Sequence, residues 1–135
     1  MALQISAAHS LARLAGTLAF ADAGVQNSRI RLYATQQPNL GQDPGDLPLV
    51  EILLAKPCGE IGVTGLQLIQ AQAGGDMVSM TGVAVWARWI NGNEEIVADG
   101  VVSDGAGEGD FKLAGTTGTQ LYAGARALLG QVTLI

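Results

Sequence analysis

The chain has 135 residues, enough for one hydrophobic core and too few for two, so we expect a single domain over residues 1–135. Hydrophobic residues make up 48% of the sequence and charged residues only 14%, well below the usual share of about a quarter. This composition favours burial of part of the surface against neighbouring molecules. The formal net charge of −5, with only seven lysines and arginines, argues against a nucleic-acid ligand.

Cysteine usage and the N-terminal residues indicate where the chain is made. The single cysteine, Cys58, cannot form an intramolecular disulfide, so folding in a reducing cytoplasm is expected. No basic segment precedes an apolar run at the N-terminus, and Arg13 interrupts the first apolar stretch, so we expect no signal peptide. No uninterrupted apolar run reaches about 18 residues, so we expect no membrane span.

The first expected element is a short amphipathic helix over residues 6–20, within an N-terminal helical arm of residues 1–24. Ser6 is a favourable N-cap residue, and Gly24 is a stop signal. The apolar side chains at three- and four-residue spacing that mark one face of this helix include Leu11, Leu14 and Leu18. Because the opposite face is only weakly polar, we expect these leucines to pack on the β domain or on a partner.

After Gly24 the pattern changes to strands, and residues 25–135 are expected to form a β-sandwich. The expected strands cover residues 28–34, 49–55, 61–69, 77–80, 83–90, 94–102, 111–114 and 125–135. A proline-containing loop follows the first strand, and Pro57-Cys58-Gly59 is expected to end the second. Short strands punctuated by 19 glycines predict a mainly β fold, an antiparallel β-sandwich or jelly roll with one short N-terminal α-helix. A five-stranded barrel is the alternative.

The strand over residues 83–90 is the most informative segment of the chain. It is rich in β-branched and aromatic residues and runs into Asn91-Gly92, a dipeptide typical of tight hairpin turns. Both of its faces are mostly apolar, which predicts cover on both sides. The face of Trp89 carries no charge, so Trp89 is expected in the core. Trp86 and Arg88 lie on the other face and are expected to form an interface with a partner.

Few residues suggest chemistry. His9 and Cys58 have no neighbouring partner that would make a base or a nucleophile, so we expect no enzyme activity and no catalytic residue. One cysteine and one histidine cannot fill a structural zinc site. The loop Asp104–Asp110 holds three carboxylates among glycines, which is typical of a solvated hairpin tip; calcium binding there is the alternative. No metal and no cofactor are expected.

Several motifs follow one another in an informative order. They are Asp22-Ala23-Gly24, Ser28-Arg29-Ile30-Arg31-Leu32-Tyr33, Gln37-Pro38, the aliphatic segment 49–55, Gly82-Val83-Ala84-Val85-Trp86-Ala87-Arg88-Trp89, Ala98-Asp99-Gly100-Val101-Val102 and Gly109-Asp110-Phe111-Lys112-Leu113. This order resembles small virion structural proteins of tailed phages and prophages, most of all the capsid cement (decoration) proteins of short-tailed phages. The resemblance covers residues 6–135 and implies a jelly roll on the outer capsid lattice. Ala34 replaces a glycine that relatives often carry, so the following turn is expected to differ.

The sequence therefore predicts a non-enzymatic virion structural protein, made in the host bacterial cytoplasm and placed on the capsid exterior. It would bind the major capsid protein lattice from outside and stabilise the head, as a homodimer or a lattice-dependent oligomer. A head–tail connector or tail-associated structural protein is the first alternative. A carbohydrate-binding host-attachment module is the second. Neither a nucleic acid nor a membrane is an expected partner.

Overall fold

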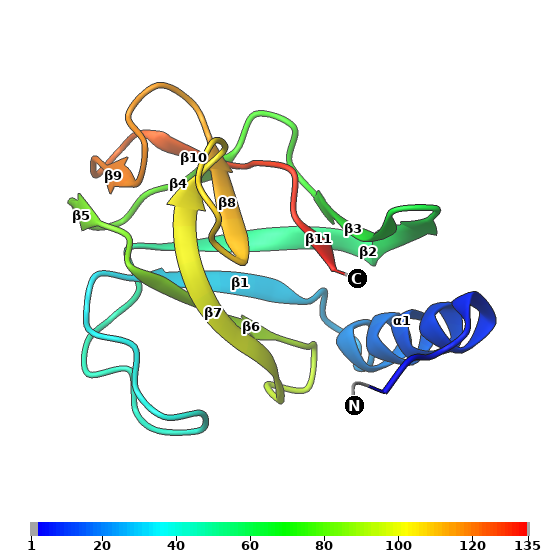
Figure 1. The fold of residues 1–135 in the computed structure, drawn as a ribbon. Helices are drawn as coiled ribbons and strands as arrows, with labels where there is room; N and C mark the ends of the chain where they lie inside the picture. The colour runs from blue at the N-terminus through cyan, green and yellow to red at the C-terminus, as the bar shows by residue number, and fades with distance from the viewer. Residues whose placement is uncertain (1–2, 135) are drawn as a thin grey trace.

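The computed structural model describes residues 3–134 and is mainly β with one short helix, which confirms the predicted fold class (Figure 1). The elements in chain order are α1 (Ala7–Ala21), β1 (Arg29–Tyr33), β2 (Val50–Gly62), β3 (Gly65–Gln70), β4 (Asp76–Met77), β5 (Gly82–Val83), β6 (Trp86–Ile90), β7 (Ile96–Asp104), β8 (Phe111–Ala114), β9 (Gln120–Leu121), β10 (Arg126–Leu129) and β11 (Thr133–Leu134).

Nine strands form one sheet in the order β11-β3-β2-β1-β6-β7-β8-β10-β4, and β5 pairs with β9 separately. All pairs are antiparallel except β7 with β8. The sheet curls, and the backbone amides of Ser79 and Met80, after β4, both donate to the carbonyl of Leu49, the residue before β2. This curled sheet is compatible with the predicted sandwich or jelly roll, and it has more strands than the alternative five-stranded barrel.

The helix forms where the sequence predicts it. The Ser6 hydroxyl accepts a hydrogen bond from the His9 amide at 3.1 Å and caps the first turn. The helix ends at Ala21, and Gly24 adopts a positive φ of 97° beyond it. In Figure 1 the helix lies beside one end of the sheet, and it contacts β2, β3 and β7. It is therefore the outside helix of the predicted architecture.

The hydrophobic core lies inside the curl of the sheet. Its fully buried side chains come from strands that are neighbours in the sheet, since β1 pairs with both β2 and β6. They include Ile30, Leu32, Ile52, Leu54, Leu66 and Trp89. The predicted core position of Trp89 is confirmed.

The second predicted strand and the third have different bounds in the structure. Pro57-Cys58-Gly59 does not end the strand: β2 continues to Gly62, and its pairing with β3 shifts register between Leu54 and Gly59. Proline lacks an amide donor, and an irregularity in the pairing is one of the few places where a strand tolerates it. The expected strand 61–69 instead covers the end of β2, the tight turn between β2 and β3, and most of β3.

The β6–β7 hairpin is confirmed, but its turn has a different geometry. The residue with positive φ is Glu94, at 63°, rather than Gly92. Gly92 is needed for close approach, because a Cβ atom there would collide with the backbone carbonyls of Gln26 and Ala23. The turn is thus shaped by the chain segment that follows α1, and not by the Asn-Gly dipeptide alone.

Candidate functional site

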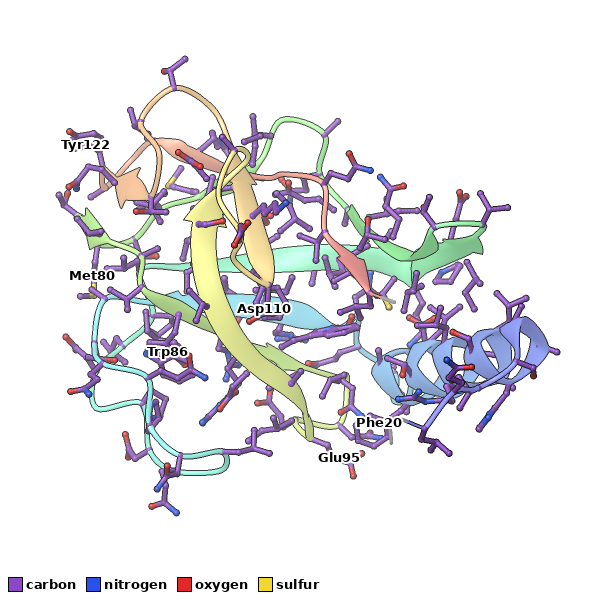
Figure 2. All side chains as sticks on the ribbon, viewed as in Figure 1. Phe20, Met80, Trp86, Glu95, Asp110 and Tyr122 are labelled. Atoms are coloured by element: carbon purple, nitrogen blue, oxygen red, sulfur yellow. The ribbon has the colours of Figure 1, made fainter. Side chains whose placement is uncertain are left out.

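Trp86 is completely buried, so its predicted place on an exposed interface is wrong. Its ring stacks on Tyr33 with a centroid separation of 4.7 Å, and its indole N–H donates to the Thr35 hydroxyl at 3.1 Å. Thr35 in turn donates to the carbonyl of Pro44 at 2.8 Å. Figure 2 shows Trp86 beside the loop between β1 and β2, which supplies the cover on this face. The two-sided cover predicted for residues 83–90 is found for β6, where the protein's own chain provides it. The predicted strand is interrupted between β5 and β6, and Val83 and Val85 are 49% and 42% exposed, so the prediction is wrong for that end.

Arg88 is also buried, and its predicted interface role is likewise wrong. Its guanidinium donates to both carboxylate oxygens of Asp99 on β7, at 2.8 and 3.0 Å, and lies 5.2 Å from the Trp86 ring centroid. The hydrogen bonds to Asp99 raise the pKa of Arg88 above its already high ordinary value. Burial raises the pKa of the neighbouring Tyr33 phenol. This cluster therefore stabilises the folded chain and offers no free group to a partner.

The three leucines predicted to form the helix interface have three different environments. Leu14 is buried in the hydrophobic core, and Leu18 packs against that core with partial exposure. Their side chains thus pack on the β domain, the first of the two predicted environments, and are not candidates for contact with a partner. Leu11, at 47% exposure, is the one of the three that remains open to solvent.

An apolar groove lies between the N-terminal half of α1 and the tip of the β2–β3 hairpin. Its volume is about 710 Å³. The residues that line it come from two short segments, and they are Ala7, Ser10, Leu11, Leu14 and Ala15 on the helix with Ile61, Gly62, Val63, Thr64 and Gly65 on the hairpin. None of these lining residues, all within the described range 3–134, carries a charged side chain. We call this surface the helix–hairpin groove.

The C-terminal end of α1 is fixed to the β domain by hydrogen bonds. The buried Asn91 side chain donates to the carbonyl of Phe20 at 3.0 Å, and the Gly92 amide donates to the carbonyl of Ala23. The Lys56 ammonium group donates to the carbonyl of Gly24 at 2.6 Å. The helix is therefore held in one position, and the groove beside it is preformed.

Sequence reasoning recognised Asn91 only as a turn residue. In the structure its side-chain oxygen accepts from the amides of Asn93 and Glu95, while its side-chain nitrogen reaches the end of α1. The available signal was the strong preference of asparagine for such side-chain-to-backbone bonds. That preference predicts the local bonds, but the partner at Phe20, 71 residues away, is set by the tertiary structure.

Cys58 is buried inside β2 rather than placed in a loop. Its amide donates to the Asp22 carboxylate at 2.9 Å, and burial raises the pKa of its thiol to about 12. The thiolate needed for a nucleophile is thus strongly disfavoured. His9 is exposed on α1. Within residues 3–134, no group of three or more histidine, cysteine or acidic side chains is arranged to hold a metal ion.

The loop Asp104–Asp110 is an ordered connection rather than a loose hairpin tip. The Asp104 carboxylate accepts from the amides of Ala106 and Gly107, and the Asp110 carboxylate accepts from the amide of Val101 on β7. The Gly109 amide also donates to the Ser103 hydroxyl. These bonds fold the loop back along β7, so that β8 leaves in the parallel direction. Two of the three carboxylates in this loop therefore accept hydrogen bonds from backbone amides of the chain.

A second exposed apolar surface lies at the opposite end of the molecule from α1. Val83 on β5 and Tyr122 just after β9 are about half exposed. Figure 1 shows β5 and β9 at the far side of the sheet from α1, and Figure 2 places Tyr122 there. We call this the β5–β9 end.

Comparison of the chain with models of protein families, with characterised proteins and with solved structures yields no match. Over residues 3–134, the structure has no helix long and apolar enough to cross a membrane.

Proposed function

We propose that this chain is a non-enzymatic structural protein of a tailed-phage virion, most specifically a capsid cement protein that binds the outer surface of the major capsid protein lattice. The motif order over residues 6–135 supports this proposal through its resemblance to such proteins. A cement protein must contact more than one neighbour to hold a shell together.

The observation that carries the proposal is the presence of exposed apolar side chains at two opposite ends of one firmly connected β body. Leu11 and Val63 are exposed at the helix–hairpin groove, and Val83 and Tyr122 are exposed at the β5–β9 end. Exposed apolar side chains that are grouped in one place, rather than scattered singly over the surface, are typical of sites of macromolecular contact. Two such sites on one rigid body fit a protein that bridges neighbours, and many identical copies add avidity to contacts that are individually weak.

The buried tryptophans remove the main aromatic candidates for a sugar platform, because neither ring is open to stack on a sugar face. A head–tail connector or tail-associated protein shares the bridging requirement and remains the alternative. The two roles differ in stoichiometry, since a cement protein repeats with the capsid lattice and a connector repeats with the portal or tail.

The decisive experiment counts the chain in purified virions of a phage that encodes it. Quantitative mass spectrometry should give a copy number that scales with the major capsid protein. A small fixed number per particle would support the connector, and absence from particles would refute a virion role.

A binding assay localises the contact. Purified protein added to particles lacking it should restore decoration, and Tyr122→Asp at the β5–β9 end should weaken attachment. Leu47→Asp, an exposed apolar-to-acid change on the loop between β1 and β2, is the matched control and should attach normally. Equal attachment by both variants would exclude the β5–β9 end as the contact surface.

A further inference from the structure

We propose that the helix–hairpin groove is a self-association site, in which α1 and the β2–β3 hairpin of one copy pack into the same groove of a second copy around a two-fold axis. This proposal identifies the contact that forms the oligomer expected under the proposed function. Its role in the virion rests on that function, but the association itself depends only on the groove.

The first argument is shape. Two of the side chains that line the groove are exposed, Leu11 from the helix and the fully exposed Val63 from the hairpin tip. A two-fold axis beside this face would place these exposed side chains of one copy against the groove of the other. An isologous contact of this kind closes on itself and gives a dimer rather than an open chain of molecules.

The second argument is charge. The chain has a net charge of −5, so a contact between two copies at most places on the surface would bring carboxylates close together. The first acidic residue in the sequence is Asp22, so the whole of α1 lacks a carboxylate, and so does the hairpin tip 61–65. This is therefore a face through which two acidic molecules can meet without like-charge repulsion.

The charges that flank the groove also favour a second copy. Arg13 on α1 lines an adjacent hollow together with the groove residues Ser10 and Leu14, and Glu60 is next to the groove residue Ile61; both charged side chains are exposed. Neither takes part in any of the ion pairs found within residues 3–134. One copy thus offers a positive group from the helix side and a negative group from the hairpin side, and a two-fold partner offers the same two groups in the opposite order.

The third argument is preorganisation. Asn91, Gly92 and Lys56 bind backbone carbonyls at the end of the helix and just beyond it, and Leu14 anchors the helix in the core. The helix wall of the groove therefore does not have to be ordered when the second copy arrives, which lowers the entropic cost of association.

The test is sedimentation of the full-length purified protein over a range of concentrations. The wild-type chain should convert reversibly from monomer to a species of twice its mass. Leu11→Glu would place a carboxylate in the groove against its symmetry mate, and we expect it to raise the dimer dissociation constant at least about a hundredfold. Leu11 is half exposed, so this variant should keep the fold and the melting temperature.

Leu40→Glu is the matched control, because it makes the same change at an exposed leucine on the loop between β1 and β2. It should dimerise like the wild type. Should Leu11→Glu fail to fold, Val63→Glu at the exposed hairpin tip tests the same face. A wild-type chain that stays monomeric up to about 0.1 mM would overturn the proposal. Dimerisation unaffected by either groove variant would overturn it equally.

The particle-binding assay separates this proposal from the proposed function. A dimer that depends on the groove but never attaches to particles would leave self-association standing and refute the cement role. Attachment of a wild-type monomer that Leu11→Glu abolishes would show that capsid protein, rather than a second copy, fills the groove. That result would refute self-association and leave the cement role standing.

Discussion

Removing the charge of Arg88 is the most discriminating test of the structure. Its side chain is 9% exposed and that of Asp99 is 4% exposed, and two hydrogen bonds join them. Arg88→Met keeps most of the side-chain volume but leaves the Asp99 carboxylate buried without its partner. Breaking a buried pair in this way costs about 3–5 kcal/mol of unfolding free energy.

The expected size of the effect is large enough to measure without ambiguity. For a domain of this length, a loss of about 3–5 kcal/mol lowers the melting temperature by roughly 10–20 °C. The double variant Arg88→Met/Asp99→Leu removes both charges and should recover most of the loss, because an apolar pair of similar volume is often as stable as a buried ion pair. Denaturant unfolding followed by tryptophan fluorescence gives all three free energies.

Arg31→Met supplies the matched control. Arg31 is the cross-strand neighbour of Arg88 and pairs with Glu51, but these side chains are 26% and 38% exposed. A solvent-exposed ion pair contributes less than about 1 kcal/mol. If Arg88→Met costs no more than Arg31→Met, the loop between β1 and β2 does not seal this face, and Arg88 is again a candidate for contact with a partner.

Three further predictions follow from the packing. Trp86→Ala and Trp89→Ala should each lower the unfolding free energy by about 3–5 kcal/mol in denaturant titrations, because both rings are fully buried; a near-neutral Trp86→Ala would restore its interface role. Gly92→Ala should lower the melting temperature, since its Cβ would collide with the Ala23 carbonyl, and a stable variant would contradict that close approach. The thiol pKa of Cys58 is raised from 9.0 in the unfolded chain to about 12, so stability from this group is complete below about pH 9 and falls as the pH rises toward 12. Cys58→Val should lack that part of the decline, and identical pH profiles of denaturation midpoints would refute the burial argument.

The sequence alone determined the features that depend on local pattern. Helix period and the Ser6 cap placed α1 to within a residue or two, because both signals lie inside the helix they define. Glycine and β-branched residues predicted a mainly β chain. The apolar character of both strand faces correctly predicted cover on both sides for Trp86–Ile90, though not for Val83 and Val85, and the uncharged face of Trp89 predicted its place in the core.

Sequence patterns failed where a distant segment supplied the environment. The cover over Trp86 comes from the loop that holds Thr35, 51 residues away, so the alternation within the strand could not show whether chain or partner lay above it. The same limit applies to Arg88, whose partner Asp99 lies on the next strand. Charge on a strand face indicates solvent or a partner only when no neighbouring strand brings the opposite charge.

Only the tertiary structure decided which apolar residues remain open. Leu11, Leu14 and Leu18 share one helical pattern, yet the β domain covers Leu14, partly covers Leu18 and leaves Leu11 at the rim of a groove. The helix period fixes which side chains share a face. How far along that face the β domain covers the helix depends on where the C-terminal end of α1 is bound. The buried side-chain amide of Asn91 sets that position by donating a hydrogen bond to the carbonyl of Phe20, and no local sequence pattern encodes this contact.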